Sequence, residues 1–359
     1  MARTSGAVSG PPVLWRLQNV GLSGGAHGRL RDVSLDVLQA STAVIGYSGA
    51  GKTSLLNILA GYEAVDSGKL DRFTAWMGVD RQPLRGDGGG RQSGWPLPVY
   101  WVPQTGGLWT HLTVREHLLV VQPGVRDRRG EELRVLSGKR ADEILARLDL
   151  SHRADARPRE LSQGEQSRLS VARGVLSGAC VLLMDEPLSH VDPVRKPGYW
   201  DVLCEYAEQA GTTLIFSCHE AEILLRHAER VIGLRDGRLW YTGTVRELYE
   251  YPPEADLGRF AGRLNWFSVG EREAIGLSQV GRTAGASRPE WIDVELASGS
   301  LEGVEVLRTR VCGGMSETDV RVGDGELRIL HRSPRVELCQ GMRIVVREQT
   351  ARERGRGHA

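Results

Sequence analysis

A glycine-rich run near residue 50 has the composition of a phosphate-binding loop. It fits the pattern G-x-x-x-x-G-K-[ST] and consists of Gly46, Tyr47, Ser48, Gly49, Ala50, Gly51, Lys52, Thr53 and the following Ser54. Glycines let backbone N–H groups turn toward phosphate oxygens, and the helix expected after them adds the positive end of its dipole. Lys52 is placed to reach the β- and γ-phosphates of a nucleotide, and the Thr53 hydroxyl is placed to bind Mg²⁺.

Two carboxylates stand at the end of an unbroken apolar run, residues 180–186. Such a run is typical of a strand buried on both faces of a parallel sheet, and the carboxyl ends of parallel strands open onto the ligand crevice. Asp185 therefore suits the Mg²⁺ shell, and Glu186 suits orienting or deprotonating an attacking water. Gln104 and His219 end two further strand-like runs, so we expect both at the same edge of the sheet. His219 is expected to contact the γ-phosphate, and Gln104 to meet Mg²⁺ or the water.

A second group of candidate residues lies in the stretch LSQGEQ, residues 161–166. Ser162 and Glu165 form the S-x-x-E pattern of a capping box, which predicts that a helix begins there. The box does not explain Gly164, because glycine costs roughly 0.8–1 kcal/mol against alanine inside a helix. A glycine in a first turn permits close approach by another group, and a helix N-terminus with a hydroxyl suits an anion. Since the glycine-rich loop already accounts for one set of phosphates, Ser162, Gln163, Gly164 and Glu165 predict a second nucleotide contact.

The surrounding sequence predicts an α/β domain that positions these residues. Strand-like runs alternate with helix-like ones, as in a parallel sheet. The expected strands cover 13–20, 33–37, 42–46, 99–104, 180–186, 212–219 and 229–237, and the expected helices cover 54–62, 113–122 and 139–150. Residues 81–98 are dense in Gly, Pro and Arg and predict a surface insertion.

The character of the sequence changes after about residue 252, where helical periodicity fades and short strand-like runs predict a small all-β, barrel-like domain. The expected organisation is a flexible N-terminus over 1–12, a nucleotide-binding domain over 13–252, a β-domain over 253–348 and a flexible tail over 349–359.

Composition limits the class of protein. The 359 residues suffice for about two domains, and 46 Lys plus Arg nearly balance 45 Asp plus Glu, which argues against binding nucleic acid. The five cysteines show no C-x-x-C spacing, so we expect buried, reduced thiols rather than a zinc site. The N-terminus lacks the apolar core of a signal peptide, and no apolar run approaches the roughly 20 residues that span a bilayer. A role at a membrane would therefore depend on partner proteins.

Together these motifs resemble the nucleotide-binding subunit of ATP-binding cassette (ABC) transporters. The matching segments, in the family's order, are the Walker A loop GYSGAGKTS (46–54), the Q-loop VPQ (102–104), the signature LSQGEQ (161–166) as a variant of LSGGQ, Walker B VLLMDEP (181–187), the D-loop SHVD (189–192) and the H-loop SCHE (217–220). The likeness covers roughly residues 13–250. It implies an α/β fold of the P-loop NTPase type, with an ABC-type ATPase domain that uses ATP and Mg²⁺ and a helical subdomain between Gln104 and Ser162.

The same resemblance implies an assembly. In the family two subunits, as a homodimer or as a pair of different ABC subunits, pack head to tail. Ser162 and Gly164 would then contact the γ-phosphate of ATP held by the partner, and Asp192 would link the two sites. Residues 106–117 resemble the surface that meets the transmembrane permease subunits.

The C-terminal part is similar to the OB- or TOBE-like β-domain of bacterial importer ATPases. Residues 241–267 resemble the connector in those proteins, and SRPEWIDV (287–294) resembles their Arg-Pro-Glu turn. The likeness favours importers of sugars and of mineral or organic ions over exporters. It implies a peripheral subunit on the cytoplasmic face of the inner membrane, working with permease subunits and an extracytoplasmic solute-binding protein.

One position departs from the family. An aromatic residue that stacks on adenine is usual near residue 24, where this chain has Gly24. The candidate substitutes are His27 and, from the neighbouring strand, Trp15. Stacking on an aromatic ring contributes on the order of 1 kcal/mol or more, so its loss predicts little discrimination between ATP and GTP.

Two other functions are consistent with parts of the sequence. A soluble ABC ATPase of repair or translation usually carries two cassettes in one chain or a long coiled coil, whereas this sequence shows one cassette and no heptads. A non-catalytic regulatory module has the missing aromatic as its only support, and the intact Lys52, Asp185, Glu186 and His219 argue against it.

Overall fold

The structure is a computed structural model. Its described residues are 10–24, 28–73, 99–123, 131–277, 285–299, 302–334 and 336–349. The predicted insertion at 81–98 lies outside them, as do most of the two predicted flexible ends. The chain divides into two compact units, Met1–Val245 and Arg246–Ala359. This boundary lies a little before residue 252, where the loss of helical periodicity placed it.

The first unit is built around a six-stranded sheet with the strand order β5-β6-β7-β3-β8-β9. Its strands are β3 (Thr42–Ile45), β5 (Val99–Val102), β6 (Val181–Met184), β7 (Thr213–Ser217), β8 (Arg230–Arg235) and β9 (Arg238–Thr244). Neighbours from β5 to β8 pair in parallel, and β9 pairs antiparallel with β8. Strands β3, β6 and β7 are buried at every position, which explains their unbroken apolar sequence.

The first two strand-like runs form a sheet of their own. Strands β1 (Val13–Leu22), β2 (Leu30–Leu38) and β4 (Ser67–Arg72) pair antiparallel with β1 in the centre. Apolar side chains of this sheet, of the six-stranded sheet and of helix α1 (Lys52–Ala60) share one buried core. That core fixes α1, and with it the glycine-rich loop before it, at the carboxyl end of β3.

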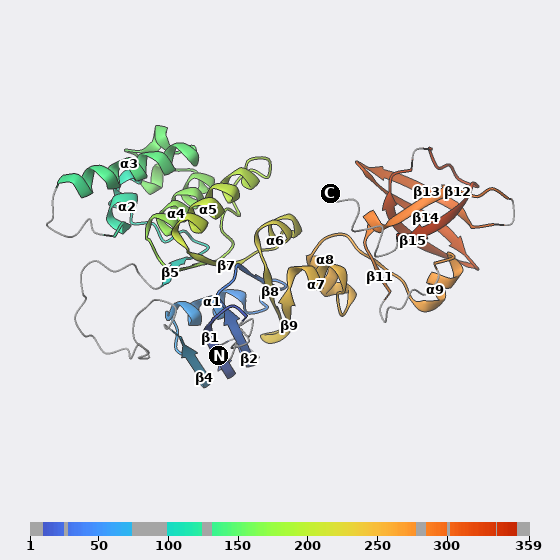
Figure 1. Ribbon diagram of the computed structural model, residues 1–359, viewed down its shortest axis with the longest axis horizontal. Coiled ribbons are helices and arrows are strands. Elements are labelled where there is room, and N and C mark those ends of the chain that lie inside the picture. The colour runs from blue at the N-terminus through green and yellow to red at the C-terminus, as the bar shows by residue number, and fades with distance from the viewer. Residues whose placement is uncertain are drawn as a thin grey trace, which may run out of the picture. The chain divides into compact units, whose positions relative to one another are not determined.

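The segment between β5 and β6 is helical. It contains α2 (Val114–Val121), α3 (Glu131–Arg147) and α4 (Gln163–Leu176), and α5 (Lys196–Ala210) and α6 (Ala221–His227) follow β6 and β7. Thr113 and Ser162 form capping boxes at the starts of α2 and α4, so the predicted S-x-x-E pattern at Ser162 marks a real helix start. Within this unit, helices α2 to α5 gather at one end, and the three-stranded sheet with α1 lies at the other (Figure 1). None of the described helices is both long and apolar enough to cross a membrane.

The second unit contains a five-stranded antiparallel sheet of order β12-β16-β13-β14-β15. Its strands are β12 (Ile292–Leu296), β13 (Val304–Cys312), β14 (Met315–Val322), β15 (Gly325–Arg332) and β16 (Arg343–Glu348). The predicted C-terminal β-structure is therefore confirmed. The unit also holds the short pair β10 (Asn265–Trp266) and β11 (Ala286–Ser287), and the helices α7 (Val245–Glu250), α8 (Ala255–Phe260) and α9 (Val269–Ala274). Helices of 6 residues are too short to show a helical period in the sequence.

The arginine of the predicted Arg-Pro-Glu turn has a structural role in this unit. Arg288 is fully buried, and its guanidinium donates hydrogen bonds to the backbone oxygens of Tyr249 (2.9 Å), Gly258 (3.2 Å) and Arg263 (3.0 Å). It also lies 4.2 Å from the centre of the Tyr249 ring. A planar group with five donors suits several carbonyl oxygens at once, so Arg288 ties the α7–α8 segment to the β-structure.

Candidate nucleotide site

The glycine-rich loop turns directly from β3 into α1. Gly51 has φ +103°, and a Cβ at this position would lie 2.7 Å from the backbone oxygen of Arg29, so the turn requires glycine. Lys52 and Thr53 are the first residues of α1. The predicted loop residues, 46–54, therefore lie on one turn at a helix N-terminus, where backbone N–H groups and the helix dipole favour a bound phosphate.

The Lys52 side chain folds back into the glycine-rich loop that precedes it. This side chain is buried, and its ammonium group donates hydrogen bonds to the backbone oxygens of Gly46 at 2.9 Å and Tyr47 at 3.2 Å. Burial lowers the pKa of Lys52, and the charges of Glu186 and Asp185 oppose that effect. An ammonium group held at this point gives the loop the positive charge that nucleotide phosphates need.

Asp185 is fixed by a hydroxyl on each of its carboxylate oxygens. The Thr53 hydroxyl donates to Oδ2 at 2.6 Å, and the Ser217 hydroxyl donates to Oδ1 at 2.6 Å. The Ser217 oxygen in turn accepts a hydrogen bond from the backbone N–H of Glu186 at 2.8 Å. Sequence reasoning missed Ser217, although its signal is visible as a polar residue that ends an apolar strand two positions before His219.

The donor set suits Mg²⁺ bound together with a nucleotide. Mg²⁺ prefers oxygen ligands and usually takes one or two carboxylates plus substrate phosphates. Thr53 and Asp185 supply a hydroxyl and a carboxylate side by side. Among the described residues, no group of three or more His, Cys, Asp or Glu could hold a metal ion alone. The chemistry of these residues therefore fits a metal whose remaining ligands come from phosphates and water.

The carboxylate of Glu186 contacts the side chains of Gln104 and His219, the two other predicted strand-end residues. The amide nitrogen of Gln104 donates to its Oε2 at 3.0 Å, and Nε2 of His219 lies 2.5 Å from its Oε1. The backbone of Glu186 has φ +46°, a left-handed conformation that is uncommon outside glycine and is concentrated at functional sites. The structure thus brings Gln104, Glu186 and His219 together at the edge of the sheet, as the strand-end argument predicts.

Two residues, Trp15 and His27, are the candidates to replace the adenine-stacking aromatic, and the structure describes only Trp15. Trp15 is only 1% exposed and belongs to the core between the two sheets, so the interpretation that it approaches the base is wrong. The apolar neighbours of β1 and α1 draw the indole inward. His27 lies outside the described residues. At Gly24 itself a Cβ would meet the Arg29 side chain at 3.0 Å.

The second group of predicted residues lies at the start of α4. The backbone N–H of Ser162 donates to Oε2 of Glu165 at 2.7 Å, and the Ser162 hydroxyl accepts from the Glu165 N–H at 3.2 Å. Ser162 and Gln163 are exposed to solvent, whereas Gly164 packs against the D-loop. Asp192, at the end of that loop, accepts a hydrogen bond from the N–H of Val194 at 2.8 Å.

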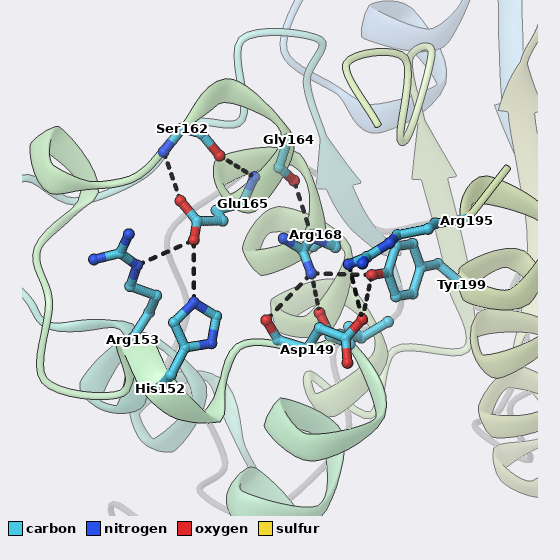
Figure 2. A network of polar contacts seen from close by, with 10 residues as sticks. Asp149, His152, Arg153, Ser162, Gly164, Glu165, Arg168, Arg195 and Tyr199 are labelled. Carbon is cyan, nitrogen blue, oxygen red and sulfur yellow. Dashed lines mark hydrogen bonds and ion pairs between the residues drawn. The ribbon is translucent and has the colours of Figure 1, made fainter. Parts of the chain in front are cut away.

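Hydrogen bonds also tie this second group to the helical segment. Sequence reasoning missed two partners of Glu165, because nothing in the local pattern of His152 and Arg153 separates them from an ordinary solvated surface. Nε of Arg153 donates to Oε1 of Glu165 at 3.1 Å, and Nε2 of His152 lies 3.5 Å from the same oxygen. Figure 2 shows both side chains converging on this carboxylate.

The thiols agree only in part with expectation. All five cysteines are free. Cys218 is buried, but Cys312 and Cys339 are exposed, so the prediction of buried roles is wrong for these two. Both lie in or near the strands of the second unit, whose sheet has a solvated face.

Comparison with known proteins shows which family this chain resembles. The family model described as ABC transporter matches residues 30–189. The thiamine import ATP-binding protein ThiQ of Ruegeria sp. is 33% identical over 216 residues, which cover 60% of this chain and 86% of that protein. The spermidine/putrescine import ATP-binding protein PotA of Haemophilus ducreyi is 31% identical over 260 residues, or 72% of this chain and 66% of that protein. The chain spans 58% of the PotA of Aliivibrio fischeri.

A solved structure agrees at the level of the fold. The ATP-binding cassette MJ0796, in a dimeric post-hydrolysis state bound to ADP and Pi, superposes with a TM-score of 0.53 at 24% sequence identity. The match covers 64% of this chain and 98% of that cassette. Because ThiQ is 33% identical and is matched over 86% of its length, the chain belongs to the ABC transporter family.

Proposed function

We propose that this chain is the ATP-hydrolysing subunit of an importer for a small solute. The observation that carries the proposal is the cluster around Glu186, in which Gln104 and His219 hold its two carboxylate oxygens next to the Asp185–Thr53 pair. A carboxylate held in this way beside a phosphate-binding loop supports a role for Glu186 as the base that hydrolysis of a γ-phosphate requires.

The chain's own residues divide the reaction between them. Lys52 and the loop N–H groups bind the phosphates, and Glu186 accepts a proton from the attacking water. The water oxygen forms a bond to the γ-phosphorus as the bond to the bridging oxygen breaks, which releases ADP and phosphate. His219 holds the Glu186 carboxylate in place and is expected to contact the γ-phosphate. Thr53 and Asp185, with the amide oxygen of Gln104, would hold Mg²⁺, which when bound neutralises charge on the β- and γ-phosphates.

The second group completes the site in a head-to-tail pair of subunits, either two copies of this chain or this chain with a related one. Ser162 and Gly164 would close over ATP held by the partner. The exposure of Ser162 and Gln163 at the start of α4 supports this role, because an exposed helix N-terminus is available to an incoming anion. Asp192, in the loop that packs on Gly164, would link the two sites.

The import role is supported by the relatives. The proteins named above are called import ATP-binding proteins, for thiamine and for spermidine/putrescine, and a protein for Fe(3+) ions from Pectobacterium atrosepticum is 27% identical over 309 residues. These names favour import over a soluble role in repair or translation. Residues 106–117 would meet permease subunits, and the side chain of Trp109 in this segment is 39% exposed. The chain would then work at the cytoplasmic face of the inner membrane, with an extracytoplasmic solute-binding protein.

The proposal is tested by identifying the membrane subunits that co-purify with this chain and measuring ATP turnover with and without them. Reconstituted together in vesicles, they are expected to show ATP hydrolysis that rises with solute and its binding protein, and the Lys52→Ala variant is expected to lose it. Hydrolysis that ignores the permease, or no association with any permease, would contradict the import role.

A further inference from the structure

Glu165 carries a negative charge at the point where the signature meets phosphate. Its side chain is only 10% exposed, and Oε2 accepts a hydrogen bond from the N–H of Ser162 at 2.7 Å. A phosphate bound to the Ser162 hydroxyl would lie within about 10 Å of this carboxylate, inside the screening length at 0.1 M salt. Like charges at this separation repel, so Glu165 alone would oppose closure over ATP. The LSGGQ pattern that the stretch resembles has a neutral glutamine here.

Glu165 does not remove this repulsion by taking up a proton. Burial by itself would raise the pKa of Glu165, but hydrogen bonds with Ser162 and the Arg153 guanidinium outweigh burial and lower the pKa to about 2. The carboxylate is therefore ionised throughout the physiological range. Its charge must be balanced by a neighbouring cation if the helix start is to receive a phosphate.

Arg153 is built into the fold as that cation. Its Nε donates to Oε1 of Glu165 at 3.1 Å, and its backbone N–H donates to the Leu150 oxygen at 2.9 Å, which fixes the short turn Ser151–Arg153. Helix α4 holds the base of this turn, because Arg168 donates to the backbone oxygens of Leu148 at 2.6 Å and Asp149 at 3.2 Å (Figure 2).

Helix α5 holds the same base from the other side. The Tyr199 hydroxyl donates to Oδ2 of Asp149 at 2.6 Å, and Arg195 lies 3.6 Å from that oxygen. Asp149 itself has φ +53°, so the backbone at this point is held in an uncommon conformation. The turn that carries Arg153 is thus anchored to both helices, while the Arg153 side chain itself is 43% exposed and reaches Glu165 from the solvent side of that turn.

We propose that Arg153 is a positioning residue for ATP-driven closure, whose guanidinium neutralises Glu165 so that the Ser162 cap can approach the γ-phosphate held by a partner subunit. The inference rests on the proposed function, because it assumes that two subunits close over ATP. Arg153 acts through Glu165 and does not itself touch the nucleotide. His152, 3.5 Å from the same oxygen, adds to the effect when it is protonated.

The inference is tested in a Glu186→Gln parent, in which ATP-bound dimers accumulate. Light scattering gives the ATP concentration at which half of the protein is dimeric. Arg153→Gln, which keeps a polar side chain but removes the charge, is expected to raise this concentration about fivefold to tenfold, and added salt is expected to shrink the difference. Arg153→Lys, which keeps the charge, is expected to retain most of the parent's behaviour.

The decisive variant combines Arg153→Gln with Glu165→Gln. A glutamine at 165 still offers an oxygen to the Ser162 N–H but carries no charge, so the pair is expected to dimerise at nearly the parent's ATP concentration. The matched control is Arg147→Gln, which breaks an arginine–carboxylate pair with Glu205 (2.5 Å) between α3 and α5 on the surface of the same unit. This control is expected to dimerise like the parent.

The outcomes separate the inference from the proposed function. If the parent dimerises with ATP but Arg153→Gln behaves as the parent does, or if Glu165→Gln fails to rescue it, Arg153 does not act by balancing charge and the inference is overturned alone. If the parent itself fails to dimerise with ATP, the proposed function is overturned, and the inference with it.

Discussion

The backbone oxygen of His190 lies 3.0 Å from the position that a Cβ on Gly164 would occupy. The D-loop therefore packs directly on the first turn of the signature helix within one chain. This contact explains why glycine stands at a helical position where it lowers stability, and it couples two segments that both serve the partner's ATP in the proposed assembly. A second glycine, Gly270, occupies the same place in the capping box of α9, but among the described residues no atom outside its own helical turn lies within 4 Å of its Cβ position.

These two glycines make a matched pair for mutation. Gly270→Ala is expected to stabilise the protein by about 0.5–1 kcal/mol, because alanine is the better helix former and the site has room. Gly164→Ala is expected to gain nothing in stability and to slow ATP hydrolysis, since the D-loop must move away from the new methyl group. Urea denaturation and ATP turnover of both variants check this. Equal stabilisation with unchanged turnover would show that the His190 contact is unimportant.

The exposed hydroxyl of Ser162 separates binding from closure. Replacing Ser162 with Arg is expected to leave nucleotide binding at the loop of the same chain within about twofold of wild type, while hydrolysis falls at least about tenfold, because the bulky side chain blocks approach of the partner. Nucleotide binding by fluorescence and turnover by phosphate release measure the two effects. Normal turnover would reduce the stretch LSQGEQ to a helix cap.

The missing aromatic near residue 24 predicts weak selection for the base. Among the described residues, Trp15 is buried in the core and cannot replace it. ATP and GTP are therefore expected to bind within about threefold of each other, since stacking would otherwise contribute on the order of 1 kcal/mol or more. Competition binding with both nucleotides is the measurement. A strong preference for ATP would mean that another group, His27 among the candidates, supplies the stacking surface.

The low pKa of the Glu165 carboxylate predicts that the free energy of unfolding falls in acid. The folded-state pKa of Glu165 is about 2, below the ordinary 4.5, so its stabilising effect is complete above pH 4.5 and is lost as pH falls toward 2. Relative to Glu165→Gln, the wild-type protein is expected to lose on the order of 1–2 kcal/mol of unfolding free energy across this range, because solvent screening discounts the full shift. Urea denaturation at pH 5 and pH 3 measures it.

Glu271 provides the control for this prediction. It fills the same position in the capping box of α9, where hydrogen bonds with Ser268 lower its pKa. Because these bonds act there without a contribution from an arginine, the difference between wild type and Glu271→Gln is expected to change less over the same pH range. An equal change for both carboxylates would mean that Arg153 contributes nothing to the acid sensitivity.

The sequence predicts that the candidate site residues gather at one edge of the sheet, because backbone geometry leaves little choice. Asp185, Gln104 and His219 follow the carboxyl ends of three strands of one parallel sheet, so topology alone brings them together. Ser162 and Glu165 form a local capping pattern that needs no tertiary information.

Other features escaped prediction because they arise from contacts between distant segments. The separate antiparallel sheet of β1, β2 and β4 depends on pairing, which apolar alternation does not encode. Ser217 and Arg153 become meaningful only through the carboxylates that they meet in space. Trp15 shows the same limit, because its burial in the core depends on packing against distant segments that its own strand does not reveal.

The central claim is that Glu186 is the base of an ATP hydrolysis site held by Gln104 and His219. The most direct measurement is ATP turnover by the wild-type chain and by Glu186→Gln, in the presence of Mg²⁺, with ATP binding followed in parallel. The account predicts that Glu186→Gln retains nucleotide binding and forms an ATP-bound dimer, while turnover falls by about 100-fold or more. Undiminished hydrolysis in that variant would contradict the assignment.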